Sequence, residues 1–325
     1  MKQKFTYGLA LLAFLVAPVL IYPVFLMKVL CFALFACAFN LLIGFTGLLS
    51  FGHAAFFGGA GYIAGWVLRD AGLPTELGLL AGAGFAALIG LLMGSLAIRR
   101  QGIYFTMITL ALAQMLYFVF LQSQFTGGED GLQGVPRGKF LGMLDLSQDM
   151  NLYYVVLAIT LMGFALIVRI VNSPFGQVLK AVKENEARAI SLGYEVSRYK
   201  LLAFILSAAL AGLAGATKTL VLGAETLTDV HWTMSGLVVL MTLVGGLGTL
   251  WGPVVGAFVI IALENKLGDF GNWLADLSQV EWFRTLGDSV TIVTGFIFIL
   301  CVLAFRKGLV GEFSAWLQRR KLAHH

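Results

Sequence analysis

Apolar runs of roughly 20 residues recur along most of this chain, and such a run is long enough for an α-helix to cross the ~30 Å hydrocarbon core of a membrane. The runs lack the polar and apolar alternation of outer-membrane strands, and a helix satisfies its own backbone hydrogen bonds inside lipid. Only 12% of the 325 residues are charged, about half the proportion found in a soluble domain. The sequence therefore predicts an all-α polytopic membrane protein.

Reading along the chain, we expect about ten transmembrane or re-entrant helices. They are predicted over residues 6–27, 29–49, 54–69, 77–98, 103–122, 152–171, 201–222, 233–248, 251–268 and 289–305. The third and the eighth are short and rich in glycine, so both full crossing and re-entry stay open for them. The first run resembles a signal peptide, but no cleavage site closes it before Met27, and we expect it to be retained.

The distribution of basic residues predicts the orientation. If all ten segments cross, both termini lie on the same side as the polar segment 172–200, and that side carries fifteen of the 22 Lys and Arg residues. Because positive charge accumulates on the cytoplasmic side of membrane proteins, we predict that this segment and both termini are cytoplasmic. Two long loops, 123–151 and 269–288, then lie outside, and the glycine and proline content of the first predicts tight turns.

The polar segment 172–200, called the island below, is the main interruption of the apolar pattern. Residues 177–192 have a helix-forming composition, follow Ser173 and Pro174, and end at Gly193, which favours one short charged helix. A plain connection between two helices needs only roughly two to eight residues. The extra length and charge predict a docking surface for another protein.

The motifs that are absent indicate where the energy for transport must come from. The sequence has no phosphate-binding P-loop and no metalloprotease or serine-hydrolase motif. An ion-driven carrier usually has ionisable groups buried at mid-span, whereas here the exceptions are His53 and the span-end residues Lys218, Glu264 and Lys266. We therefore expect no cofactor in this chain and an energy source in partner subunits.

Two glycine-rich segments, Gly44–Tyr62 and Gly245–Ala257, interrupt the spans, one in each half of the chain. Paired interruptions of this kind border the substrate route in transporters built from repeats. The predicted pathway residues lie at the first interruption, with one polar residue from a neighbouring span: Ser50, Phe51, Gly52, His53 and Gln114. The alternative for His53 is a hydrogen bond at a helix end, and for Gln114 a hydrogen bond between helices.

Four segments, in the same order over essentially the whole chain, carry a resemblance to a known family. They are GFTGLLSFGHAAFFG (Gly44–Gly58), GIYFTMITLA (Gly102–Ala111), TGGEDGL (Thr126–Leu132) and SPFGQVLKAVKENEARAISLG (Ser173–Gly193). Through them the chain resembles the permeases of branched-chain amino acid ABC transporters of the LivM type. The resemblance implies that 1–325 is a single permease domain of an importer in the bacterial cytoplasmic (inner) membrane.

The same resemblance implies partners and a coupling site. The partners are a LivH-type permease in a heterodimer, two cytoplasmic ABC ATPase subunits that bind the ATP, and an extracytoplasmic solute-binding protein. The coupling helix of the family maps onto 180–193, and the ATPase-coupling residues would be Lys180, Glu184, Asn185, Glu186, Arg188 and Gly193. Where the family commonly has Arg before the Glu, this chain has Lys183, which keeps the charge without the bidentate geometry, so we assign it no contact.

We expect a non-catalytic subunit that imports branched-chain amino acids, and the alternative is an ABC importer of urea, short amides or other amino acids. An ion-coupled secondary transporter is disfavoured by the ion-poor spans, and a membrane enzyme by the lack of a polar catalytic cluster. A pathway rich in Gly, Ala, Phe and Leu suits a branched-chain amino acid and urea alike.

Single cysteines in a cysteine-free background test the predicted orientation. Gln133→Cys in the first outer loop and Ser191→Cys in the island should react with an impermeant maleimide from opposite sides of the membrane. Thr75→Cys and Leu250→Cys then report on the two short spans. Labelling of Gln133→Cys and Ser191→Cys from the same side would contradict the ten-span topology.

Overall fold

The computed structural model describes residues 14–18, 21–278, 295, 296, 299 and 308–312. The predicted span 289–305 and both termini lie largely or wholly outside the described residues. Of the predicted span 6–27, residues 14–18 and 21–27 are described, and 23–27 already belong to the helix that follows, so the predicted boundary between 6–27 and 29–49 is wrong.

The described chain is almost entirely helical. Its main helices are α2 (Pro23–Thr46), α3 (His53–Arg69), α4 (Thr75–Ala97), α5 (Ile103–Gln122), α6 (Asp149–Asn172), α7 (Pro174–Glu184), α8 (Glu186–Ser191), α9 (Val196–Leu222), α10 (Leu227–Val230), α11 (Trp232–Gly245) and α12 (Gly252–Ser278). The short strands are β1 (Leu132–Gln133), β2 (Lys139–Phe140), β3 (Leu144–Asp145) and β4 (Ala224–Glu225). Within the described residues, α2, α4, α5, α6 and α9 are long and apolar enough to cross a membrane. The prediction of an all-α polytopic membrane protein is confirmed.

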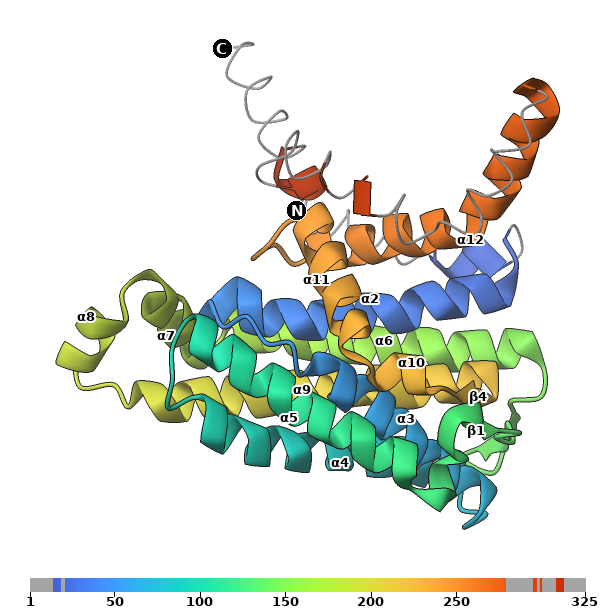
Figure 1. Ribbon diagram of the computed structural model, residues 1–325, viewed down its shortest axis with the longest axis horizontal. Helices are drawn as coiled ribbons and strands as arrows, with labels where there is room; N and C mark the ends of the chain where they lie inside the picture. The colour runs from blue at the N-terminus through green and yellow to red at the C-terminus, as the bar shows by residue number, and fades with distance from the viewer. Residues whose placement is uncertain (1–13, 19–20, 279–294, 297–298, 300–307, 313–325) are drawn as a thin grey trace.

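The long helices run side by side along one axis, with α7 and α8 at one end and the short strands at the other (Figure 1). Helix α2 is the central one, because α6, α9, α11 and α12 all pack against it. Almost every residue of α2 from Leu26 to Thr46 is buried. A helix that is apolar all round can be buried on every side in this way.

Small residues bring α4 and α9 together. Gly82, Ala86 and Gly90 lie one turn apart on the face of α4 that meets α9. A Cβ added at Gly82 would lie 2.9 Å from the Cβ of Ala216 on α9. Such stripes of small residues let helix backbones approach closely in a membrane. The opposite face of α4 and the outer face of α5 expose large apolar side chains, among them Leu80, Leu88, Leu92, Leu96, Met107, Met115, Phe118 and Val119.

The two short predicted spans are short helices. Helix α3 has 17 residues and α11 has 14, which corresponds to lengths of about 26 and 21 Å at 1.5 Å per residue. Both lengths fall below the ~30 Å of a hydrocarbon core. The chain before α11 is not continuous helix, because His231 is extended and separates it from the four-residue α10.

The loop over residues 123–151, which the sequence predicts to lie outside, is rich in turns, as its composition predicts. Strand β1 pairs antiparallel with β4, so that Leu132 lies opposite Glu225, and β2 pairs with β3 in a hairpin. Gly131 has φ +72°, and the carbonyl oxygen of Glu225 occupies the place that a Cβ at Gly131 would take. The loop is therefore tied to the chain that follows α9. The second loop, expected over 269–288, differs: α12 continues to Ser278, where apolar residues still recur at helical spacing.

The island contains two helices, so the prediction of one helix over 177–192 is wrong. Helix α7 ends at Glu184, and Asn185 adopts an extended conformation with φ −157° and ψ 98°. The Asn185 side chain accepts a hydrogen bond of 3.0 Å from the backbone N–H of Arg188 and so caps the start of α8. Asparagine is a strong N-cap residue, and here that preference outweighs the helix propensity of its neighbours. Gly193 ends α8 with φ +89°, as predicted.

A matched pair of glycine substitutions tests the helix packing. A Cβ at Gly215 on α9 would overlap the carbonyl oxygen of Phe57 on α3, whereas a Cβ at Gly84 on α4 would meet nothing within 4 Å. We expect Gly215→Ala to cost about 1–3 kcal/mol of stability through overpacking. Gly84→Ala should leave stability equal or slightly raised, because alanine has the higher helix propensity. Melting temperatures in detergent measure both, and equal values would contradict the close approach of α3 and α9.

Candidate functional site

The segment between α2 and α3, residues 47–52 and called the break below, turns back into the helix bundle. Gly47 closes α2 in the left-handed conformation with φ 77°. At the far end of the break, the His53 ring meets the Phe39 ring edge-on, with centroids 4.9 Å apart. Phe39 lies about two turns before the end of α2. Helix α3 therefore begins inside the bundle, beside the middle of its neighbours (Figure 1).

Hydroxyl groups of α5 satisfy part of the backbone of the break. The Oγ1 of Thr106 donates to the carbonyl oxygen of Leu49 at 2.9 Å. The backbone N–H of Phe51 donates to the Oγ1 of Thr109 at 3.2 Å. Thr106 and Thr109 lie three positions apart on one face of a helix, which lets both reach the same strip of chain. Non-helical backbone at membrane depth is tolerated only where protein or water supplies such partners.

Ser235 of α11 holds the other side of the break. Its Oγ donates to the carbonyl oxygen of Phe51 at 2.8 Å and accepts from the backbone N–H of Ala54 at 2.9 Å. One hydroxyl thus joins the start of α3 to the first turn of α11. The starts of the two short helices therefore meet inside the bundle. The start of α3 lies within the first glycine-rich segment, 44–62, whereas the second, 245–257, begins only at the end of α11.

The structure places four of the five predicted pathway residues at the break or directly after it, but not as free ligands. Ser50 is buried and its Oγ accepts from the backbone N–H of Gly52 at 3.1 Å. His53 is fully buried, and its Nε2 lies 2.8 Å from the Oγ of Ser207, which in turn donates to the carbonyl oxygen of Ala38. His53, the first residue of α3, therefore links this helix to α9 and, through Ser207, to α2. This agrees with the alternative given for His53, a hydrogen bond at a helix end.

Gln114 lies apart from these hydrogen bonds, on α5. Its Nε2 is buried and has no hydrogen-bond partner among the described residues. Phe51 contributes its backbone rather than its ring to the contacts given above. Of the predicted set, Ser50, Gly52 and His53 are thus brought together, and Gln114 is not hydrogen-bonded to them.

Sequence reasoning missed a buried ionic cluster at the C-terminal end of α9, formed by Lys218, Glu225 and Asp229. The Nζ of Lys218 contacts Oδ2 of Asp229 and lies 3.4 Å from Oε2 of Glu225. Glu225 is fully buried, and its Oε2 also accepts from the Oγ1 of Thr219 at 2.5 Å. Glu225 and Asp229 escaped notice because they follow the predicted span. Lys218 could have indicated the cluster, because a buried lysine without a counter-charge is too costly in free energy.

One positive charge faces two carboxyl groups in this cluster, so it is neutral only if one carboxyl carries a proton. Glu225 lies beyond the end of α9, and burial raises the pKa of its carboxyl well above the usual range, with the nearby Asp229 charge acting in the same direction against Lys218. Its Oε1 has no hydrogen-bond partner among the described residues. The arrangement assigns the proton to Glu225 and the ion pair to Lys218 and Asp229.

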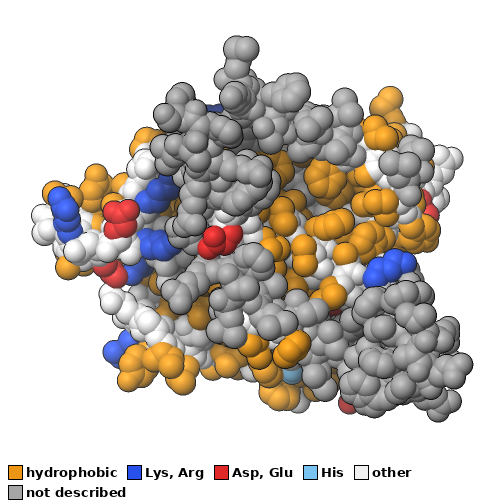
Figure 2. Space-filling view, turned by 90° about the horizontal axis from the view of Figure 1, so that it is seen from above, with side chains coloured by type: hydrophobic (Ala, Val, Ile, Leu, Met, Phe, Trp, Pro, Cys, Tyr) orange, Lys and Arg blue, Asp and Glu red, His pale blue; other side chains and the backbone are white. Residues whose placement is uncertain are grey.

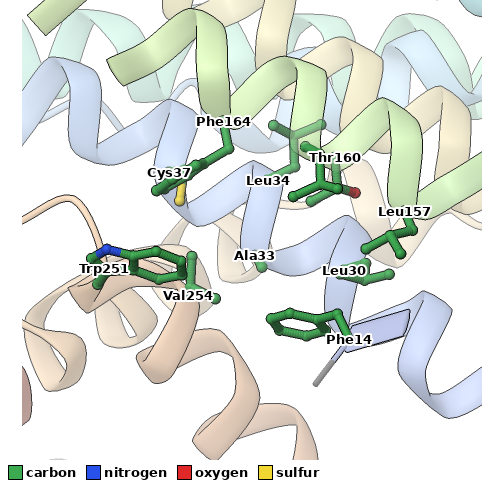
Figure 3. A pocket seen from close by; sticks show the side chains of 11 residues that line it. Phe14, Leu30, Ala33, Leu34, Cys37, Leu157, Thr160, Phe164, Trp251 and Val254 are labelled. Carbon is green, nitrogen blue, oxygen red and sulfur yellow. The ribbon is translucent and has the colours of Figure 1, made fainter. Parts of the chain in front are cut away.

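An apolar cavity of about 130 Å³ lies between α2, α6 and the start of α12 (Figure 3). Its lining includes Leu34 of α2, Phe164 of α6 and Val254 of α12, with Phe14 closing one side. Besides the Thr160 hydroxyl, the lining side chains are apolar or carry the indole of Trp251. Such a cavity accepts an apolar side chain, but it offers no charged partner for an ammonium or a carboxylate.

The island is the charged end of the described bundle, and the sequence predicts that this end faces the cytoplasm. Figure 2 shows Lys, Arg, Asp and Glu side chains gathered at the end of the molecule that bears α7 and α8, while hydrophobic side chains cover much of the middle. Buried Lys200 of α9 donates to Oε1 of Glu186 at 2.7 Å and so fixes α8 against α9. Ile190 and Leu192 stay exposed beside these charges. The island is thus a fixed surface with apolar and charged groups side by side.

A family profile described as "Branched-chain amino acid transport system / permease component" matches residues 22–302. The chain belongs to this family of ABC transporter permeases. Its apolar helices and its relatives make it a multi-pass protein of the bacterial inner membrane.

Curated relatives of this permease differ in what they are named for. The high-affinity branched-chain amino acid permease LivM of Escherichia coli is 25% identical over 257 residues, 72% of this chain and 60% of LivM. The autoinducer 2 import permease LsrC of Klebsiella pneumoniae is 31% identical over 201 residues, 59% of this chain and 53% of LsrC. The ribose import permease RbsC of Bacillus subtilis is 28% identical over 209 residues, 60% and 58% of the two chains. The permease thus spans about three fifths of the length of LivM.

Two conservative substitutions in the ionic cluster test where the permease holds its proton. Glu225→Gln keeps a neutral side chain of the same shape, so we expect stability at pH 7 to change by no more than about 1 kcal/mol. Asp229→Asn removes the partner of a buried ammonium and should cost about 3–5 kcal/mol. Melting temperatures of the detergent-solubilised variants measure the difference. A larger loss from Glu225→Gln than from Asp229→Asn would reverse the assignment.

The raised pKa of Glu225 also predicts that the melting temperature depends on pH. Because the pKa of Glu225 is raised by folding, its stabilising contribution is complete below the unfolded pKa and is lost as the pH rises toward the folded pKa. The melting temperature of the wild-type permease should therefore fall between pH 5 and pH 8 by more than that of Glu225→Gln. Parallel pH profiles would show that Glu225 does not change its charge on unfolding.

Proposed function

We propose that this permease forms half of the translocation pathway of an ATP-driven importer of branched-chain amino acids. The observation that carries the proposal is the family match over residues 22–302, supported by similarity to LivM over most of the chain. The fold supports it through an apolar bundle whose described charges lie mainly at its two ends (Figure 2). The permease itself is non-catalytic in this proposal, and the ATP is bound by other subunits.

The proposed partners supply what this chain lacks, since its sequence contains no motif that binds ATP. A LivH-type permease would supply the other half of the pathway, two cytoplasmic ABC ATPase subunits the energy, and an extracytoplasmic solute-binding protein the substrate. The exposed Ile190 and Leu192, beside charged residues of α7 and α8, support an ATPase-docking role for the island. Exposed apolar side chains among charges are typical of protein interfaces.

Within the docking surface, the proposed coupling residues divide into two groups. Asn185, Glu186 and Gly193 shape the island, through the α8 cap, the ion pair with Lys200 and the left-handed turn. The other residues, Lys180, Glu184 and Arg188, are the ones whose side chains would meet the ATPases.

The break supports the proposed passage of a zwitterion. Helix α3 begins inside the bundle, and helix N-termini favour negative charge such as a substrate carboxylate. The hydroxyls of Thr109 and Ser235 already bind the backbone there and can exchange those bonds for bonds to a substrate. No fixed charge has to be neutralised among these residues. Passage of a molecule that carries both charges but no net charge is compatible with such a lining.

A second candidate substrate class is a small hydroxylated molecule. LsrC is more identical to this chain than LivM is, although over fewer residues, and RbsC is named for ribose. A lining of hydroxyls and backbone groups suits a sugar as well. Urea, which is small and neutral, is the third class to test.

Competition for uptake decides between these classes. In vesicles that hold the complete assembly, labelled leucine should enter only with ATP inside the compartment of the ATPases. Excess isoleucine or valine should block its uptake, whereas ribose and urea should not. ATP-driven uptake of ribose or urea without uptake of leucine would move the permease to another substrate class. Leucine uptake without ATP would contradict the coupling to ATPases.

A further inference from the structure

The two glycine-rich interruptions of the chain touch each other at the inner end of α2. Gly44, in the last turn of α2, packs on Gly248, in the loop between α11 and α12. A Cβ at Gly44 would lie 2.8 Å from the backbone N of Gly248, and a Cβ at Gly248 would lie 3.2 Å from the carbonyl oxygen of Gly44. Gly248 also has φ +73°, which favours glycine on its own. This contact requires glycine on both sides.

The buried side chain of Asn40 stabilises this contact through two hydrogen bonds. Its Nδ2 donates to the carbonyl oxygen of Thr249 at 2.8 Å, and its Oδ1 accepts from the backbone N–H of Gly248 at 3.0 Å. The side chain is buried, so both hydrogen bonds are shielded from water. Asn40, Gly44, Gly248 and Thr249 together are called the joint below. The joint makes the end of α2 and the α11–α12 loop one unit.

Lys183 connects the joint to the island. Its Nζ donates to the carbonyl oxygen of Gly44 at 2.7 Å. That carbonyl belongs to the last turn of α2, where acceptors lack helical partners and where the helix dipole favours a cation. The stem of Lys183 lies over Gly47, since a Cβ there would come within 3.3 Å of its Cγ. One turn earlier on α7, the ammonium of Lys180 lies 5.9 Å from the Phe45 ring centre.

We propose that Lys183 is the positioning residue that transmits movement of the island to both glycine-rich interruptions of the permease. The inference rests on the proposed function, in which the ATPases move the island. A displacement of α7 pulls on the Gly44 carbonyl through a charge-assisted hydrogen bond, which is stronger than a neutral one. Asn40 passes that displacement to the α11–α12 loop. From the joint, the backbone runs in one direction through the break into α3. In the other direction it runs back along α11 to Ser235, which accepts a hydrogen bond from Ala54 in the first turn of α3. Both routes therefore end at the start of α3.

This assignment differs from a direct contact of Lys183 with an ATPase. Much of the Lys183 side chain is exposed, but its ammonium is used inside the permease. Asn40 is buried in the bundle and offers no surface to a cytoplasmic subunit. If the joint transmits the movement, removal of either residue should have the same effect, and removal of both should add little.

The test measures transport and ATP hydrolysis together in proteoliposomes that hold the complete assembly. Lys183→Met keeps the length of the side chain and removes its donor. We expect it to retain the ATPase subunits on co-purification, to hydrolyse ATP, and to lose roughly tenfold in leucine taken up per ATP, in line with the loss of one hydrogen bond from a charged group. Lys183→Arg should restore most of the ratio, because a guanidinium also donates to a carbonyl.

Two further variants separate coupling from folding. Arg100→Met removes an exposed cation in the turn between α4 and α5, outside the island, and it should leave the ratio unchanged. Asn40→Leu should lower the ratio as Lys183→Met does, and the double variant should be no worse than either alone. If Lys183→Met fails to accumulate, Lys183→Gln, which keeps a shorter neutral donor, takes its place.

Three outcomes would overturn the inference. The first is a wild-type ratio of leucine taken up per ATP in Lys183→Met. The second is loss of the ATPase subunits from that variant on co-purification. The third is a double variant of Lys183→Met and Asn40→Leu in which the ratio falls by the product of the two single losses. A wild-type assembly without ATP-driven uptake is a different result. It would contradict the proposed function and not the role of Lys183.

Discussion

The structure depends on how backbone groups are satisfied where the chain leaves a helix inside the bundle. Unpaired N–H and C=O groups are costly in the hydrocarbon region, and the break would expose several of them. Thr106 and Thr109 from α5 and Ser235 from α11 supply the partners. Because these helices come from different parts of the chain, α3 can begin inside the bundle only when they are assembled around it.

The same requirement explains which parts of the fold the sequence predicts. The spans that became α2, α4, α5, α6 and α9 are continuous apolar runs, and hydropathy alone locates them. The short spans are harder, since glycine and hydroxyl residues mark an interruption but not the path of the chain through it. The island was predicted as a unit, yet its division at Asn185 depends on a local cap that competes with helix propensity.

The candidate site shows a similar division. Composition indicated that Ser50, Gly52 and His53 mark an interruption, and they do lie at one. Ser207, the partner of His53, and Ser235, which bonds to the neighbouring Phe51 and Ala54, lie more than a hundred residues further along and carry no local signal of contact. The ion pair of Lys218 with Asp229 escapes prediction for another reason, because Asp229 lies beyond the end of the predicted span. A buried lysine requires a counter-charge, and the next acidic residues along the chain provide it.

Strand β4 gives its end of the molecule an unexpected thermodynamic property. Glu225 takes part in the β1–β4 pairing that holds the first outer loop, and it also carries the buried carboxyl of the ionic cluster. Any motion that lifts the loop and admits water to Glu225 lowers the cost of its ionisation. Opening of this loop and release of a proton are then linked equilibria. Acidity on the side of the membrane that the loop faces, which is the outer side in the predicted orientation, favours the closed loop.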